Sequence, residues 1–344
     1  MGKMALLVVL GLSIAVGIIS YTINKSTQQL TENVVGFDKY TTARNIAHTA
    51  VNMMLRRMDK GDTSIVNKVN RGEVASISIN VMAGQCSVYI KTKNPPPSLD
   101  TIDMTSKSKY MDSSYTMKLR LQRTAKPFPA IGGALSIASA PFGFDMNGTP
   151  HIYGENYNMD GTRGNTALDT NGIAVTTSAE SSIVAAFGSK ITGDPKSVVV
   201  NPVDNPISYV REYIEGADIV FANGSNNSGT YGSKTNPVIG YADGEVKFGG
   251  NGKFYGVLVV HGTLDFVGTF DFYGLVIAYG DDNVINVSTS AGTPQIWGGM
   301  IVTGLPGSNF TMKGTADIRY SAEALNMAHF IDKMQAYKVI WWYE

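Results

Sequence analysis

The feature that most constrains this chain is a run without a charged residue, from Met4 to Asn24. At about 1.5 Å per residue, a helix of this length spans roughly the 30 Å of a bilayer's hydrocarbon core. A cleaved secretory signal is the alternative, but it needs a shorter apolar core followed by a small-residue cleavage site. No such site follows the run. The run therefore predicts a retained membrane anchor.

The chain continues beyond this anchor without a proline as far as Asp59, and its apolar residues recur in steps of three and four. This spacing is typical of one stripe on an α-helix. Joined to the anchor, it predicts a single helix over residues 1–60, the first domain. The helix is either a plain stalk or a rod that packs against copies of itself. The residues expected to form that assembly surface are Met4, Leu7, Leu10, Ile14, Ile18, Leu30, Val34, Phe37, Ala47 and Met54.

Residues 61–126 predict a second domain, an antiparallel meander of four short strands. Apolar residues alternate with polar ones before and after Gly84, which is the pattern of strands with one buried face. The lone cysteine, Cys86, falls in register with the buried positions, and we expect it to be a packed thiol. A single cysteine excludes an intrachain disulfide and a metal site built from several cysteines.

A repeated motif, G-T-x-x-apolar-aromatic-G, dominates residues 127–344 and predicts a third domain. Its last four copies begin 18, 24 and 22 residues apart. Segments of this length suit single turns of a right-handed parallel β-helix, in which each turn covers the apolar face of the next. A short β-sandwich is the structural alternative. The five copies begin at Gly148, Gly250, Gly268, Gly292 and Gly314.

Four aromatic residues occupy the same position in successive copies of the motif. They predict a column of rings that either stack from turn to turn or offer a platform for sugar rings. These repeat aromatics are Tyr153, Tyr255, Tyr273 and Trp297.

Two further segments complete the predicted third domain. Residues 176–245 lack the motif and are expected to be an insertion that leaves the β-helix. Residues 321–337 have the spacing of an amphipathic helix, and we expect this helix to cap the open end of the β-helix.

The fold class is therefore α+β, with a long N-terminal transmembrane and amphipathic helix, a small meander and a C-terminal β-helix. The final apolar residues, 339–343, predict a strand or tail packed on the body or on a neighbouring subunit.

The charge balance and the absence of known motifs limit the functions that this chain can have. Lys and Arg number 28 and so do Asp and Glu, and no basic stripe is evident, which argues against nucleic-acid binding. No phosphate-binding, nucleophile-elbow or Cys/His ligand pattern is present, so neither a cofactor nor a catalytic centre is expected. Calcium binding at Asp281–Asn283 is the alternative to an ordinary turn there. A polysaccharide-cleaving site is the catalytic alternative. Its candidate carboxylates are Asp145, Asp265, Asp271, Asp281 and Asp282.

A charge-poor helix that spans a membrane, continues as an amphipathic rod and leads into an antiparallel meander resembles the type IV pilins. The Gly-rich repeats resemble those of pilin-like proteins that carry a pilus-assembly N-terminal domain. Two pilin features are missing: no glutamate precedes Glu32, and one cysteine cannot form the family's C-terminal disulfide. Type IV pilins carry a short leader that is cleaved after a glycine, and the resemblance implies that Gly2 marks this cleavage site here.

The resemblance implies a structural subunit of an extracellular filament that serves adhesion or surface interaction. The subunit would be anchored in the inner membrane before assembly and exposed at the cell surface afterwards. Its implied partners are copies of itself, the pilus assembly machinery and a surface polysaccharide. A membrane-anchored β-helix protein that binds or cleaves polysaccharide as a monomer is the alternative function.

Overall fold

The structure, a computed structural model, describes residues 2–70, 73–81, 83–92, 101–126, 128–201, 206–329, 331 and 334–343. The chain divides into two compact units. Unit 1 consists of Met1–Thr124 and Tyr337–Glu344, and unit 2 consists of Ala125–Ala336. The division differs from the predicted domains 1–60, 61–126 and 127–344, because the helix and the meander belong to one unit and the last residues of the chain return to it.

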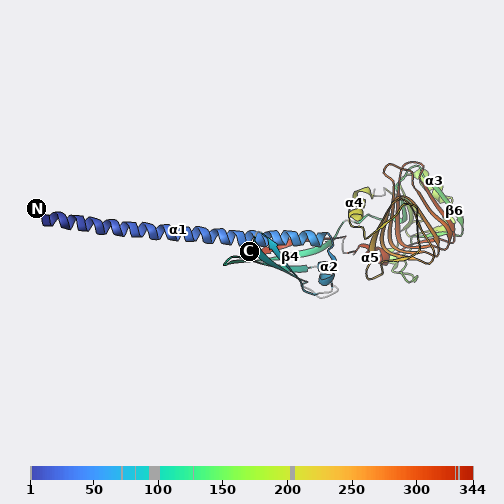
Figure 1. Ribbon diagram of the computed structural model, residues 1–344. Coiled ribbons are helices and arrows are strands. Elements are labelled where there is room, and N and C mark those ends of the chain that lie inside the picture. Colours follow the sequence, from blue (N-terminus) through green and yellow to red (C-terminus); the bar gives the residue numbers. More distant parts are fainter. Residues whose placement is uncertain are drawn as a thin grey trace. The chain divides into compact units, whose positions relative to one another are not determined.

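Unit 1 begins with one long helix, α1 (Gly2–Asp59), as predicted (Figure 1). The helix is terminated just before Gly61, whose φ of 67° lies in the left-handed region that glycine enters without strain. Beyond that residue, the amide of Asp62 donates to the carbonyl oxygen of Arg57 at 3.0 Å, and the Arg57 guanidinium pairs with the Asp62 carboxylate at 2.7 Å. A short helix, α2 (Thr63–Asn70), follows.

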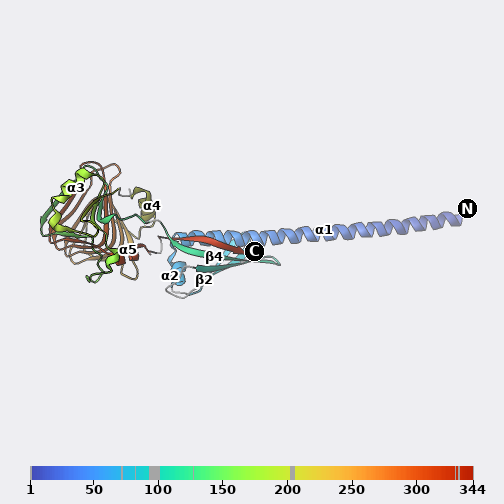
Figure 2. The ribbon, with the colours of Figure 1, turned by 180° about the vertical axis from the view of Figure 1, so that it is seen from behind.

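The remainder of unit 1 is an antiparallel sheet with the strand order β1-β2-β3-β4-β21 among the described residues. The first four strands form the predicted meander. The fifth strand comes from the far end of the sequence, and Figure 2 shows it in red beside β4. The strands are β1 (Ala75–Val81), β2 (Gly84–Thr92), β3 (Thr101–Tyr110), β4 (Ser113–Ala125) and β21 (Gln335–Tyr343).

The core of unit 1 lies between the second half of α1 and one face of this sheet. Alternate residues of β2 to β4 are buried, so their other face is turned outward. Two serines tie the layers together: Ser108 Oγ donates to the Ala43 carbonyl at 2.6 Å, and Ser106 Oγ donates to the Ala47 carbonyl at 3.2 Å. The Cys86 thiol is fully buried beside Ser106, as the alternation predicts.

Unit 2 is built on a curled parallel sheet that contains sixteen strands among the described residues (Figure 1). One path of paired strands through it is β10-β8-β5-β18-β16-β15-β17-β19-β6, and the long strand β14 pairs with β15 outside this path. The strands are β5 (Gly133–Ile137), β6 (Gly143–Gly148), β7 (His151–Tyr153), β8 (Asn171–Val175), β9 (Ile191–Thr192), β10 (Val198–Val200), β11 (Ile219–Phe221), β12 (Ser225–Asn227), β13 (Thr230–Tyr231), β14 (Val238–Phe248), β15 (Lys253–Gly268), β16 (Asp271–Tyr279), β17 (Asn286–Gly292), β18 (Gln295–Thr303), β19 (Asn309–Gly314) and β20 (Asp317–Tyr320).

The repeated motifs stack in register. Tyr255 pairs with Tyr273, Tyr273 with Trp297, Trp297 with Arg319, and Arg319 with Tyr153. The first copy of the motif in the sequence therefore follows the last copy in space. Strands β5 to β10 extend the sheet beyond the turn formed by β18 to β20.

Glycines make this close stacking feasible. Gly256, Gly274 and Gly298 pair with one another, and each has a φ between 132° and 135°. A Cβ on Gly274 would lie 1.9 Å from the carbonyl oxygen of Gly256, and one on Gly298 would lie equally close to that of Gly274. The column therefore accepts no residue with a side chain.

Alternate residues along these strands point into two separate cores. Phenylalanines fill the inner core and stack from turn to turn, with Phe254 and Phe272 at 5.1 Å between ring centroids. The outer core lies beneath two helices, α4 (Ile207–Glu215) and α5 (Ala322–His329). The strands are buried on both faces there, which explains their nearly continuous apolar sequences.

Two expectations for unit 2 need correction. Residues 176–245 do not leave the sheet, because β9 to β13 and part of β14 lie within this range and pair with it. These strands lack the motif, so its spacing could not find them. The helix expected over 321–337 is shorter, and it contacts the central strands β15, β16 and β18 instead of capping an end.

The end of the sheet at β10 is covered by α3 (Ser178–Ala185), whose Val184 packs into the inner core together with Phe187 beyond the helix. Two short 3₁₀ helices, η1 (Thr166–Leu168) and η2 (Gly188–Lys190), complete the unit. The closure of the curled sheet into a complete right-handed β-helix stays a prediction.

Candidate functional site

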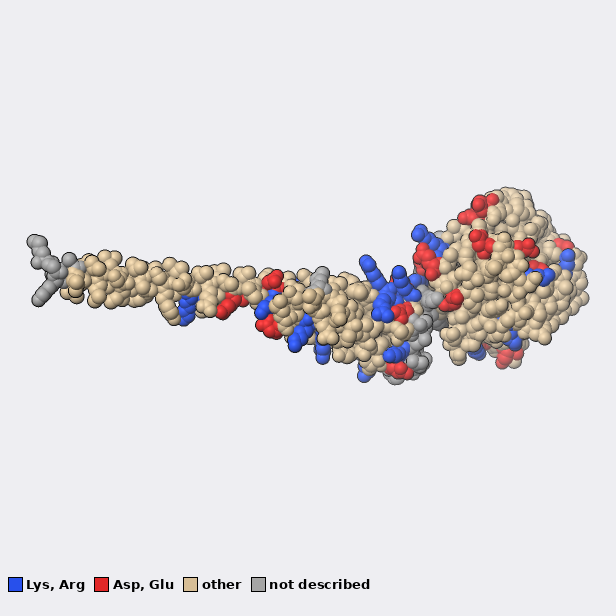
Figure 3. All heavy atoms as spheres, viewed as in Figure 1, with Lys and Arg blue, Asp and Glu red and all other residues tan. Residues whose placement is uncertain are grey.

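The first candidate site is the part of α1 from its N-terminus to Phe37, called the first half of α1 below, whose large apolar side chains have no covering element within the described chain. Its most apolar window has a mean hydropathy of 2.4, and none of that window is buried. Leu7 is 67% exposed and Phe37 is 72% exposed. Figure 3 shows no charged side chain on the visible face of this stretch before the first basic one. By length and composition, α1 can cross a membrane.

The predicted assembly residues fall into two groups. Leu7, Leu10, Ile14, Ile18, Leu30, Val34 and Phe37 are all exposed, whereas Ala47 and Met54 are fully covered by the sheet of their own unit. The single apolar stripe predicted from the sequence therefore has two environments: its first part is exposed, and its second part is buried against the sheet of unit 1. The side chain of Met4 lies outside the described residues.

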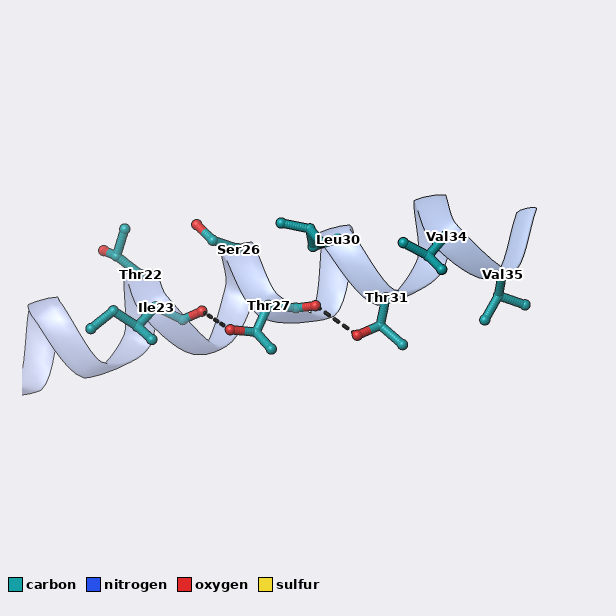
Figure 4. Close-up of a pocket in the computed structure, with 8 residues that line it drawn as sticks. All are labelled: Thr22, Ile23, Ser26, Thr27, Leu30, Thr31, Val34 and Val35. Carbon is teal, nitrogen blue, oxygen red and sulfur yellow. Dashed lines mark hydrogen bonds between the residues drawn. The ribbon is translucent and has the colours of Figure 1, made fainter. Parts of the chain in front are cut away.

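The middle of α1, between Thr22 and Val35, carries threonines whose hydroxyl groups are satisfied by the helix itself (Figure 4). Thr27 Oγ1 donates to the Ile23 carbonyl at 2.9 Å, and Thr31 Oγ1 donates to the Thr27 carbonyl at 2.9 Å. Thr22 makes the same contact with Ile18 at 2.8 Å. Because these donors need no outside partner, this surface can be buried without losing hydrogen bonds.

The second candidate site is the column of repeat aromatics. The rings of Tyr255 and Tyr273 stack at 4.8 Å with an interplanar angle of 9°, and those of Tyr273 and Trp297 at 6.3 Å with an angle of 7°. Tyr273 and Trp297 are only 8% and 5% exposed, because Ala324 and Met327 of α5 and Tyr157 pack beside them. Burial raises the pKa of Tyr273 to about 12. Tyr273 and Trp297 therefore present little ring surface to a ligand, whereas Tyr153 and Tyr255 are only partly buried.

An arginine replaces the aromatic residue in the last copy of the motif and continues the column. The Arg319 guanidinium lies 4.6 Å from the Trp297 ring centroid and 5.5 Å from that of Tyr153. Its Nη2 donates to the Asp317 carboxylate at 2.7 Å. Burial raises the pKa of Asp317, and the charge of Arg319 opposes that shift. A cation between two aromatic faces is a stable packing arrangement. From the motif alone, Arg319 is a departure from the aromatic residue expected at this position.

A third cluster surrounds His261 on the outer surface of the curled sheet. His261 Nδ1 lies 2.9 Å from Asp243 Oδ1, and Nε2 lies 2.9 Å from Asp281 Oδ1 and 3.6 Å from Asp282 Oδ1. Burial lowers the pKa of His261, but its hydrogen bonds to the two aspartates outweigh that effect and leave the pKa raised. One ligand atom each from His261, Asp281 and Asp282 lie within 4.8 Å of one another, a spacing that could hold a divalent cation.

The other candidate carboxylates are engaged by neighbours along the strands. Asp265 accepts hydrogen bonds from Ser288 and Ser290, both at 2.7 Å, and Asp271 lies 3.2 Å from Lys253 Nζ. Asp145 accepts a short hydrogen bond from Asn147. Asp265 and Asp271 therefore link adjacent turns, whereas the contact of Asp145 lies within its own strand, β6.

Comparison with known proteins adds little to this description. No family model and no curated protein matches the chain. A crystal structure of the competence-associated pilin ComZ from Thermus thermophilus aligns over 89% of this chain and 97% of that chain, with 8% sequence identity and a TM-score of 0.25. The likeness is too slight to define the fold, which rests on the strand pairings described above. The long apolar helix at the N-terminus is a feature that fits a pilin-like protein.

Proposed function

We propose that this chain is a structural subunit of a type IV pilus-like extracellular filament, assembled through the first half of α1. Before assembly the same half anchors the chain in a membrane. The observation that carries the proposal is the exposed apolar surface of α1, which borders directly on a half whose apolar stripe is buried against the sheet. Covering each large apolar side chain stabilises the protein by about 1.5–3 kcal/mol, so a surface of this size requires lipid or protein around it.

The extent of the apolar surface favours a filament over a simple anchor. The uncharged run ends at Asn24 and is long enough to cross a bilayer. Leu30, Val34 and Phe37 lie beyond it and are as exposed as the residues within it. A juxtamembrane stalk in water gains nothing from such side chains, whereas a bundle of parallel copies buries them.

Small residues on the same helix support close packing between copies. A Cβ placed on Gly11, Gly17 or Gly36 would meet nothing within 4 Å. Open glycine positions allow the backbones of neighbouring helices to approach, as in membrane helix pairs. The proposed role is structural and uses neither a cofactor nor a catalytic step. Unit 2 would be displayed outward for adhesion, with a surface polysaccharide as its proposed ligand.

The first test is electron microscopy of filaments sheared from producing cells, with mass spectrometry of the same fraction. We expect this chain to dominate ordered filaments, and a variant that lacks residues 4–24 to be absent from them. If the complete chain remains in the membrane pellet while no filament contains it, the proposal is wrong. A chain that binds polysaccharide equally well without residues 4–24 would then point to the monomeric alternative.

A point substitution separates assembly from anchoring. Val34→Asp places a charge on the apolar stripe beyond the uncharged run, and we expect normal membrane insertion without filaments. Gln28→Asp is the matched control, because it adds the same charge on the opposite side of the helix. Equal filament yields for the two variants would contradict the proposed contact.

A further inference from the structure

The neutral net charge of the chain conceals a strong separation of charge between the two units. Unit 1 contains 17 Lys and Arg against 9 Asp and Glu, a formal net charge of +8. Unit 2 contains 11 Lys and Arg against 19 Asp and Glu, a formal net charge of −8. The charge count of the whole sequence missed this separation. In Figure 3, red side chains are spread over the visible face of unit 2, while most blue ones lie on unit 1.

Much of the positive charge of unit 1 lies on the outward face of its sheet. This basic sheet face consists of Lys91 on β2, Lys107 and Lys109 on β3, and Lys118 and Arg120 on β4. The four lysines are exposed. Lys107 lies two residues from Lys109 on β3 and diagonally across from Lys118 on β4, so these three charges are close together, whereas Lys91 lies opposite Asp103.

The basic sheet face has one described carboxylate, Asp103, whose Oδ1 accepts a hydrogen bond from Arg120 Nε at 2.8 Å. Lys107 Nζ lies 5.9 Å from the centroid of the Tyr89 ring. Lys91, Lys109 and Lys118 have no ion pair with any residue that the structure describes. The neighbouring charges of Lys107, Lys109 and Lys118 repel one another and have no ion pair among the described residues, so an anionic partner would relieve this repulsion.

Unit 2 carries a compact group of acidic side chains that fits such a face. This acidic ridge consists of Asp243 and Glu245 on β14 and of Asp281 and Asp282, which follow β16. All four are exposed, and Asp282 is the most exposed of the three aspartates, at 80% of its side chain. His261 holds Asp243 and Asp281 in place from the strand between them.

We propose that the basic sheet face of one copy docks on the acidic ridge of a second copy of this chain. The two surfaces have opposite charge and lie on different units, so the contact is heterologous. A heterologous contact that does not close into a ring produces an open helical assembly. The inference rests on the proposed filament and names its second interface, outside the helical core.

Electrostatic contacts of this kind set partner choice and register more than total affinity. We therefore expect that the apolar helices hold the filament together and that the charged contact fixes how successive copies are offset. Salt should weaken the contact, because the Debye length falls from about 8 Å at physiological ionic strength to about 3 Å at 1 M.

The test is charge reversal in the full chain, with filament yield and order measured by electron microscopy of sheared material. The basic-face variant is K107E/K109E/K118E, and the ridge variant is D281K/D282K. We expect each to lower the yield of ordered filaments at least about tenfold, because like charges then face each other across the contact. A chain that carries both sets of reversals restores opposite charges, and we expect its yield to recover.

Two controls accompany the reversals. E212K/E215K changes the charge of unit 2 by the same amount as the ridge variant, on the exposed side of α4, and should assemble like the wild-type chain. Thermal unfolding of each variant establishes that folding is intact, which we expect for exposed positions.

The outcomes separate this inference from the proposed function. If the wild-type chain forms no filaments, the proposed function fails and the inference falls with it. If it forms filaments but the reversal variants assemble normally, the docking contact alone is wrong. Failure of the combined variant to recover, although it folds, would also overturn the contact and would point to an anionic partner other than unit 2.

Discussion

The two halves of α1 belong to one continuous helix and have similar apolar stripes, yet their surroundings are opposite. Around Ala47 and Met54 the helix is buried by its own sheet, whereas around Leu10 and Ile14 it is exposed along its entire circumference. An apolar stripe thus shows only that a surface needs cover. Whether this cover comes from the same chain, from lipid or from another copy depends on what the rest of the sequence can place beside it.

A charge introduced into each half of α1 should give the largest difference between the two halves. Ala50→Asp puts a carboxylate into the core of unit 1 and should unfold that unit, because an unpaired buried charge costs more than about 4 kcal/mol. Ile14→Asp should leave the unfolding of unit 1 unchanged and abolish filaments. Hydrogen exchange of the strand amides in unit 1 measures the first effect, and electron microscopy measures the second. Protected strands in Ala50→Asp would show that this half is not a core.

Thiol labelling should distinguish the two halves almost as strongly. Cys86 is covered by the second half of α1, and burial raises the pKa of its thiol. Labelling at pH 8 should therefore require unit 1 to open and should be at least about a thousandfold slower than in denaturant. In a Ser26→Cys variant, the new thiol should react freely in monomers and become protected when filaments form. Protection in isolated monomers would mean that another part of the same chain covers this half.

Truncation of a single apolar side chain should have a smaller effect that is confined to one half. Met54→Ala leaves a cavity and should destabilise unit 1 by about 2–5 kcal/mol, measured by denaturant unfolding. Leu30→Ala removes a comparable side chain from the exposed half and should change this stability by less than about 0.5 kcal/mol. Similar losses of unit 1 stability in the two variants would contradict the proposed difference between a buried and an exposed half.

The smallest effect is expected from the threonines of the exposed half. Thr27→Val and Thr31→Val replace hydroxyl groups that bond only to the helix's own carbonyl oxygens. We expect changes of less than about 0.5 kcal/mol in helix stability and no loss of filaments. A clear loss of assembly, seen as fewer sheared filaments, would show that these hydroxyl groups bond to neighbouring copies.

Much of the fold follows from local patterns in the sequence. The uncharged run and its continuation predict α1, the alternation around Cys86 predicts the meander, and the repeated motif predicts the pairing of Tyr255, Tyr273 and Trp297 in register. These features depend on residues close in sequence or on near-identical segments. They are therefore visible without a structure.

Other features depend on contacts that no local pattern encodes. The pairing of β21 with β4 joins the final residues to a sheet formed about two hundred positions earlier, and the strands between residues 176 and 245 lack the motif. The position of α5 over the middle of the sheet depends on which strands offer an apolar outer face. The opposite charges of the two units emerge only when the boundaries between them are known.

The return of β21 to the first sheet has a consequence for biosynthesis. Unit 2 is inserted between β4 and β21, so nearly all of its residues leave the ribosome before the strand that completes unit 1. During that interval β4 has an open edge, which is a template for unwanted strand pairing. A nascent chain that is truncated anywhere in unit 2 therefore keeps this edge unpaired. Pairing of β21 with β4 removes this open edge.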